Sequence, residues 1–541
     1  MDLRRRVTSY LRASPFRGKP WGTTLQFSTN DREEFVDASK LHQYFDLKTS
    51  GREAERLMKS TKVLLIIAVV VLLGLAAHSR SQSPSQPSEA LTGFDDQSNG
   101  FSDPDRRQAD QKFFDEVEHI APDGLGPLYN AQSCRECHQT PVSGASSQVT
   151  ELRVGHLDAH GLFQNPEIPI NHGSEIIKDR TLVNDRAICS EIQEHVPDTA
   201  TVRTTRLVTN ILGDGYVEAI SDETLLNIRK QQCRASHGRI CGQAVKVPVP
   251  TSEGKDRIGR FGWKDQHASL LAFAADAYLN EMGITNSIQK KEVTTTCNPP
   301  VTTATPNKDS GKITEPNSLP DPTDNNLEDI DHFASFMRSL KAPSRDQSTA
   351  TASDVKHGAE LFSKIGCATC HVETIVTGKS RAGSGGPGLH PDALENRTIH
   401  PYSDFLLHDV GTGDGIAVAL VEHFGRKRLE KRLREEAGAA GEVKEPFGKP
   451  EDECSESYQT AVAEGEKHPQ LLRDTLCARN KIRTAPLWGL RLRSRLMHDG
   501  NSLEVDDAIR RHRGEATHIT ERFLKLKASD QKVLLAFLQS L

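Results

Sequence analysis

Two short stretches decide the interpretation of this sequence: Cys134-Arg-Glu-Cys137-His138 and Cys367-Ala-Thr-Cys370-His371. In both, two thiols three positions apart can each add to a vinyl group of one haem, and the imidazole that follows can reach the iron. A zinc site would need further soft ligands close by, and a thioredoxin-like site would need a surrounding βαβ pattern. Neither accompanies the two motifs. We therefore predict two covalently attached haem c groups, with His138 and His371 as iron ligands.

The surroundings of the two motifs repeat. Apolar residues at Leu361, Phe362 and Ile365 predict a short helix that leads into the second motif. Amphipathic segments at 330–340 and 530–541 each end in an aromatic, an apolar and a polar residue, then Ser and Leu. A helix, a haem motif, irregular chain and a closing helix make up a c-type cytochrome domain. We predict a mainly α fold: two tandem c-type cytochrome domains with long irregular loops, after an N-terminal signal or anchor segment.

The domain boundaries follow from this repeat. We place the first cytochrome c-like haem domain at 100–341 and the second at 354–541, with a linker at 342–353. A charged segment at about 425–480 is predicted to be an insertion into the second domain. The Ser-, Pro- and Gln-rich segment at 79–99 is predicted to be a disordered tether.

The N-terminal region indicates export. Residues 63–77 form an apolar run of 15 residues, which is short for a spanning helix of about 20 residues and suits a signal-peptide core. One interpretation starts translation at Met58, makes 58–78 a signal peptide and leaves 1–57 untranslated. The other keeps a cytoplasmic tail and a short membrane anchor. Both predict a periplasmic protein, soluble or tethered to the inner membrane.

Composition excludes several function classes. The 541 residues include 68 Lys and Arg and 74 Asp and Glu, for a net charge of −6. This balance argues against nucleic-acid binding and against a polybasic membrane surface. The absence of glycine-rich nucleotide-binding motifs argues against a flavin or NAD enzyme.

Six further cysteines stand outside the two motifs. Their even number and the exported location predict three disulfides. Spacing does not choose among the pairings, although Cys454 with Cys477 is a local pair within the insertion. The other four are then expected to tie down the chain around the first haem. The six are Cys189, Cys233, Cys241, Cys297, Cys454 and Cys477.

Beyond the haem motifs, the chain resembles the di-haem oxidoreductase family of peroxidases, also called thiol oxidoreductases. This family is related to bacterial di-haem cytochrome c peroxidase and to the MauG-type enzymes. The resemblance covers roughly residues 100–541. It rests on NAQSCRECH at 130–138, GDGYVEAI at 213–220, GRFGWK at 259–264, NEMGIT at 280–285, YSDFLLHD at 402–409, RTAPLWG at 483–489 and LMHDG at 496–500.

The resemblance implies two catalytic residues. The family's Glu-Met-Gly segment carries a Glu that works as acid and base above the peroxide-binding haem, and Glu281 matches it. Trp263 fits the Trp that carries electrons between the haems. Without the resemblance, the sequence is equally consistent with a structural role for both residues, Glu281 as a helix-end cap and Trp263 as a core residue. The Gln that accompanies the family's Glu is not matched, since Phe273 stands near its place.

The resemblance also addresses the iron of the second haem. In the peroxidases its sixth ligand is a Met about a dozen residues beyond a His-Asp-Gly segment, and His512 stands in that place here. Met497 is the alternative. Two His ligands would give a lower potential than His and Met, because thioether sulfur favours ferrous iron. Arg483 is expected to bond to a haem propionate or to backbone.

The implied reaction is the reduction of hydrogen peroxide to water. Electrons would come from a small donor protein of the cytochrome c or cupredoxin type and pass from the second haem to the first. One alternative is a non-catalytic di-haem electron carrier, in which another His closes the first iron. A second alternative is MauG-like oxidation of a protein side chain. A calcium ion between the domains is left open. The candidate closing residues are His156, His160, His172 and His195.

Overall fold

The chain divides into two units, Met1–Ser85 and Gln86–Leu541, and the described residues all belong to the second. The predicted export segment, Cys454, Cys477 and nearly all of the predicted insertion lie outside the described residues. Within these residues, no helix is both long and apolar enough to span a bilayer. The computed structural model describes residues 86–158, 163–172, 175–250, 256–294, 296–297, 317–350, 352–380, 387–417 and 478–541.

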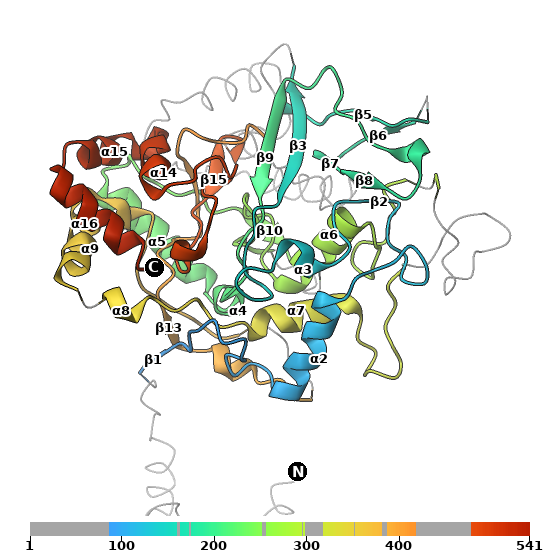
Figure 1. Cartoon of the computed structure of the whole chain (residues 1–541), viewed down its shortest axis with the longest axis horizontal. Coiled ribbons are helices and arrows are strands. Elements are labelled where there is room, and N and C mark those ends of the chain that lie inside the picture. Colours follow the sequence, from blue (N-terminus) through green and yellow to red (C-terminus); the bar gives the residue numbers. More distant parts are fainter. Residues whose placement is uncertain are drawn as a thin grey trace, which may run out of the picture. The chain divides into compact units, whose positions relative to one another are not determined.

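Most helices fall into two groups, with α9, α14, α15 and α16 on the left of Figure 1 and α2, α3, α6 and α7 on the lower right. The three helices predicted from periodicity are confirmed as α7, α9 and α16. Helix α9 packs against α16, while α7 packs against α2 and α6. The helices are α2 (Pro104–Asp115), α3 (Cys134–Cys137), α4 (Asp214–Glu218), α5 (Asp222–Ala235), α6 (Leu270–Met282), α7 (Asp329–Ser339), α8 (Gln347–Ala350), α9 (Ser353–Ile365), α14 (Val505–Arg511), α15 (Thr517–Leu524) and α16 (Ala528–Leu538).

The prediction of a mainly α fold is wrong. The described residues are 33% helix and 17% strand, and the strands form many small sheets. Most strands have only two or three residues, too few to show an alternating pattern in the sequence. They are β1 (Ser88–Glu89), β2 (Leu128–Tyr129), β3 (Thr150–Leu157), β4 (Phe163–Gln164), β5 (Ile168–Pro169), β6 (Ile176–Ile177), β7 (Leu182–Val183), β8 (Arg186–Ala187), β9 (Val202–Leu207), β10 (Lys246–Pro248), β11 (Asp256–Ile258), β12 (Ile375–Val376), β13 (Arg397–Ile399), β14 (Leu407–Asp409) and β15 (Lys481–Arg483).

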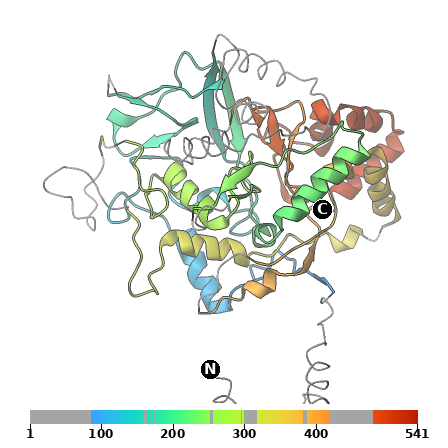
Figure 2. The same ribbon diagram turned by 180° about the vertical axis from the view of Figure 1, so that it is seen from behind.

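The two longest strands, β3 and β9, form an antiparallel ribbon. In Figure 1 this ribbon stands between the C-terminal helices on the left and the small strands β5 to β8 on the right, and Figure 2 shows the same order from behind. The pairing runs from Thr150 opposite Leu207 to Gly155 opposite Val202. It places Glu151 directly across from Arg206.

Two large apolar clusters form the core, and each draws on distant parts of the chain. The first, centred on α6 and α7, includes Phe405 and Trp488 from the C-terminal part. The second, centred on α9 and α16, includes Ile240. Each core cluster therefore contains residues from both sides of the 342–353 segment.

The described part of the predicted disordered tether is ordered. Strand β1 pairs in parallel with β13. Asn99 is buried, and its Nδ2 donates to the carbonyl oxygens of Arg338 and Leu340 at 2.9 and 3.1 Å. Residues 86–99 are thus a structural part of this unit, because their backbone and side-chain polar groups find partners in it.

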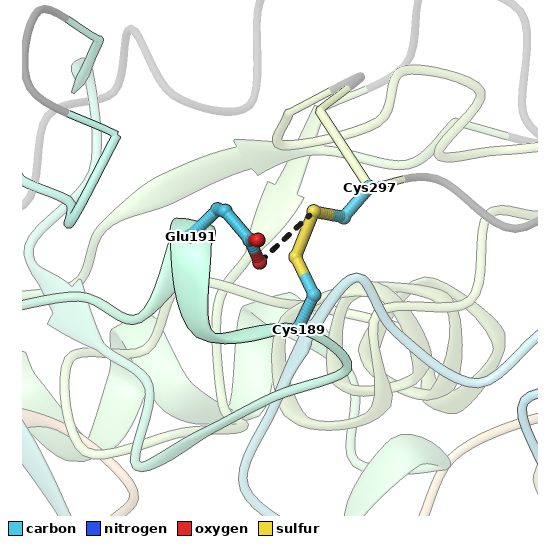
Figure 3. Close-up of side chains that lie close together, drawn as sticks. All are labelled: Cys189, Glu191 and Cys297. Carbon is cyan, nitrogen blue, oxygen red and sulfur yellow. Dashed lines mark hydrogen bonds between the residues drawn. A yellow bond between two sulfur atoms is a disulfide. The ribbon is translucent and has the colours of Figure 1, made fainter.

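Four of the six further cysteines are paired, as Cys189–Cys297 and Cys233–Cys241. Figure 3 shows the first pair beside Glu191. The expectation that all four surround the first haem is wrong for Cys233–Cys241. Gln232, next to Cys233, donates to the carbonyl oxygen of Thr369 at 2.7 Å, so this pair lies beside the second motif.

Candidate functional site

The first motif is built on a single helical turn. The hydroxyl of Ser133 accepts a bond from the backbone N–H of Glu136 at 3.1 Å and so caps α3. The Nδ1 of His138 lies 3.2 Å from the carbonyl oxygen of Ala145. Because a carbonyl oxygen can only accept, Nδ1 carries the proton and Nε2 is left to bind a metal. Burial lowers the pKa of His138 to about 4, which keeps the imidazole neutral, as a ligand must be.

The second motif brings together two histidines with the same tautomer. The Nδ1 of His371 lies 2.9 Å from the carbonyl oxygen of Tyr402, and that of His512 lies 2.7 Å from the carbonyl oxygen of Ala508. The centroids of the two rings are 6.5 Å apart. Two imidazoles on opposite sides of one metal, each nitrogen about 2 Å from it, place their centroids about 6 to 7 Å apart. The spacing fits an iron held between His371 and His512.

A cavity with about 1550 Å³ of empty space, part of it open solvent, surrounds this second motif. Its walls are largely apolar, while thiols, imidazoles and guanidinium groups also face it. This set fits a haem, which needs thiol attachment, axial ligands, apolar walls and cations for its propionates. The lining includes Cys367, Cys370, His371, His512, Met497, Trp263, His498, Arg483, Arg493, Arg495, Phe362, Leu487, Leu490, Leu496, Ile509 and Ile519.

Arg483 lines this cavity with part of its hydrogen-bonding capacity unused. Its Nη1 donates to the carbonyl oxygen of Arg260 at 3.3 Å. Its Nε is buried without a hydrogen-bond partner and lies 4.0 Å from the carboxylate of Asp265. An acceptor such as a propionate would complete the bonds of the guanidinium.

Glu281 lies beside the first motif, at the C-terminal end of α6. Its Oε2 accepts a 2.7 Å bond from Nδ2 of Asn130, whose Oδ1 accepts from the backbone N–H of Asp185 at 2.9 Å. The second bond fixes which end of the amide faces Glu281. Burial, and secondly the nearby charge of Glu281, raises the pKa of the Cys137 thiol to about 12. Glu281 is therefore held in place next to the motif and is not a free helix-end cap.

Trp263 lies beside the second motif and is bonded to the strand that leads towards the first. It lines the cavity of the second motif and contacts His498 edge-on, with ring centroids 6.2 Å apart. Its Nε1 donates to the carbonyl oxygen of Leu207 at 2.7 Å. Two residues further along, the backbone of Thr209 faces His138. Protein contacts thus run from the second cavity through Trp263 to the segment beside His138.

The chain is similar to a known protein family. Residues 182–427 match the family model described as "Di-haem oxidoreductase, putative peroxidase". The resemblance to the di-haem oxidoreductases is confirmed. The match contains Trp263, Glu281 and the second motif, and it implies haem cofactors.

Among curated proteins, none matches the chain. A structure of Kuenenia stuttgartiensis hydrazine synthase is 14% identical and covers 86% of this chain and 96% of its own, with a TM-score of 0.31. A similarity that low carries no conclusion about the fold.

Sequence reasoning missed Glu151 on β3. Its side chain is hydrogen-bonded to that of Glu281. Burial, and secondly the negative charge of Glu151, raises the pKa of Glu281 to about 8. Burial would also raise the pKa of Glu151, but Arg153 and Arg206 outweigh it and lower that pKa. The two glutamates are 130 positions apart, so their spacing in the sequence does not connect them. The only hint is the alternation of side-chain types along residues 150–157, which is typical of a strand.

The partner that the di-haem oxidoreductase resemblance implies is replaced. Phe273, near the place of the family's Gln, stacks on Phe261 with ring centroids 6.1 Å apart and packs against the first core cluster. Asn130 and Glu151 make the polar contacts to Glu281 instead.

The histidines proposed to close the first iron are spread along the chain. His156 lies on β3 five residues beyond Glu151, or about 16 Å further along an extended strand. His172 is exposed, and His195 is bonded to Asn171 at 2.7 Å. His160 lies outside the described residues. Ligation of the first iron by any of them stays a prediction.

Proposed function

We propose that the protein is a di-haem c-type peroxidase that reduces hydrogen peroxide to water. The observation that carries this proposal is Glu281, a carboxyl with a pKa of about 8 held beside the first haem motif. A proton donor and acceptor near neutral pH, close to a bound iron, is what cleavage of an O–O bond needs. The family match supports the coarser assignment, a di-haem oxidoreductase.

The chain offers thiol and imidazole groups to hold two haems. Cys134 and Cys137 would attach the first haem and Cys367 and Cys370 the second, and these four are the free cysteines of the described residues. His138 would ligate the first iron, while His371 and His512 would ligate the second. Once bound, the haems supply the redox chemistry, and the protein supplies position and electrostatics.

Glu281 carries the proton chemistry. It gives a proton to the outer oxygen of hydrogen peroxide, which then leaves as water, and takes the proton of the inner oxygen in exchange. An acid-base group placed in this way contributes about 10²–10⁴-fold to the rate. Overall, one hydrogen peroxide, two electrons and two protons give two waters. The protons come from solvent and the electrons from a small donor protein, with Trp263 on the route between the motifs.

The cellular setting is part of the proposal. Export to the periplasm rests on the apolar run at 63–77 alone, and a donor of the cytochrome c or cupredoxin type would suit that compartment. MauG-like oxidation of a protein side chain would use the same haems with a different partner.

A stopped-flow experiment tests the function. The haem-loaded protein is fully reduced and mixed with one equivalent of hydrogen peroxide, and haem oxidation is followed by absorbance. We expect both haems to be oxidised rapidly, with two electrons consumed per peroxide. Haems that remain reduced until an electron acceptor is added would instead identify an electron carrier.

The ligand assignment of the second haem is tested by two substitutions. His512→Ala is expected to convert the second iron from low spin to high spin, because it removes the imidazole opposite His371. Met497→Ala is the matched control, since Met497 lines the same cavity, and it should leave the spin state unchanged. Absorption and EPR spectra report both. The reverse result would make Met497 the ligand.

A further inference from the structure

We propose that Glu151 is a positioning residue whose contact keeps one proton on Glu281, so that Glu281 can act as acid and as base without a net change in the charge of the pair. This inference rests on the proposed peroxidase function and deepens it. Neither the haem motifs nor the family match assigns a role to Glu151.

The ribbon geometry holds Glu151 as the charged member of the pair. Arg153, two residues along β3 and so on the same face, forms a two-pronged bond to it: Nε to Oε1 at 2.9 Å and Nη2 to Oε2 at 3.1 Å. Arg206 lies directly across on β9, with its Nη1 3.9 Å from Oε1. Two guanidinium groups facing one carboxylate favour its ionised form.

The contact between the glutamates then requires a proton on Glu281. Two ionised carboxylates in contact would repel each other, and a hydrogen bond between two carboxyl groups needs one proton. Asn130 occupies Oε2 of Glu281 as a donor, so it cannot accept that proton. The pair therefore holds one proton, which resides on Glu281 at neutral pH.

Other charged groups that face the pair are themselves neutralised. Glu136 of α3 is paired with Arg186 of β8 at 2.8 Å. Arg206 is also bonded to Asp414 at 2.8 Å. The proton on Glu281 is thus held in a preorganised field of paired charges.

The proposed step balances in protons and electrons. Glu281 gives its proton to the outer peroxide oxygen, the O–O bond breaks, and its electron pair leaves with the water. Glu281 takes the proton of the inner oxygen in exchange, so the pair holds one proton before and after the step and Glu151 stays ionised. The inner oxygen would leave as the second water once the donor protein has supplied two electrons and solvent two protons.

Infrared spectroscopy of the oxidised, haem-loaded protein tests this inference without relying on activity. Subtracting the spectrum of Glu281→Gln from that of the wild type isolates the C=O band of the protonated Glu281 carboxyl. We expect this band to disappear with a midpoint near pH 8. In Glu151→Gln the midpoint should move at least one pH unit lower, because a neighbouring negative charge is gone, and peroxide turnover should fall at least about tenfold.

Two further variants complete the design. Glu151→Asp keeps the charge and should keep the midpoint close to that of the wild type, which also provides a measurement if the Gln variant folds poorly. Glu167→Gln is the control, since Glu167 is an exposed carboxylate paired with Lys178 at 2.6 Å. It should change neither the band nor turnover.

The results separate this inference from the proposed function. An unchanged midpoint in Glu151→Gln would overturn this role of Glu151 even if the protein reduces peroxide. A shifted midpoint in a protein that does not turn over peroxide would refute the peroxidase function and leave the carboxyl pair standing.

Discussion

Glu281→Gln is expected to lower the turnover of hydrogen peroxide by about 10²–10⁴-fold, the range lost with a positioned acid-base group. Gln keeps the size of the side chain and its bond with Asn130 but can neither accept nor release a proton at neutral pH. Haem content and the spectrum of the second haem should be unchanged, because Glu281 contacts neither His371 nor His512. Steady-state turnover with a reduced donor measures the effect.

A matched control for this variant is Glu292→Gln. Burial raises the pKa of Glu292 to about 8 as well, but its partners are Thr285 and Asn317, away from either haem motif in sequence. It should leave turnover unchanged. Equal turnover in Glu281→Gln and the wild type would remove the catalytic role from Glu281.

Asp414→Asn is expected to destabilise the protein by about 3–5 kcal/mol, the cost of leaving buried charges without their partner. The carboxylate of Asp414 lies 2.7 Å from Nζ of Lys264 and 2.8 Å from Nη2 of Arg206, and all three side chains are buried. Burial alone would raise the pKa of Asp414, but Lys264 and Arg206 hold it at about 2. Urea unfolding measures the loss.

The depressed pKa of Asp414 also sets a pH dependence. Its ordinary value is 3.8, so the ion pair stabilises the folded state above about pH 4, and this stabilisation is lost as pH falls towards 2. In the Asn variant this acid-dependent loss should be absent. Asp506→Asn is the control: its bond to Arg510 is as short, at 2.6 Å, but exposed, and such pairs are worth about 0–1 kcal/mol. Equal destabilisation by both substitutions would contradict the account.

Chemistry confined to a few neighbouring residues could be predicted from the sequence. The cysteines and His138 and His371 lie within five-residue motifs, and α7, α9 and α16 have clear helical periodicity. The mixed fold could not be predicted, since two-residue strands carry no pattern of their own. Their pairing depends on partners far along the chain, as β1 with β13 shows.

Contacts between distant segments account for the missing part of the site. Glu281 was predicted through the family resemblance, whereas Glu151 was not, because only the β3–β9 ribbon brings it to α6. The spacing of His512 from the 496–500 segment made it a candidate ligand, and packing of α14 beside the second motif places its ring 6.5 Å from that of His371. Its ligation stays a prediction.

Absorption and EPR spectra of the haem-loaded protein, oxidised and half-reduced, with and without hydrogen peroxide, test the central claim most directly. We predict one low-spin iron, held by two histidines, and one iron that is high-spin, or becomes so on half-reduction, and whose signal changes when peroxide is added. Two low-spin irons at every stage, unaffected by peroxide, would contradict the peroxidase assignment and make the protein an electron carrier.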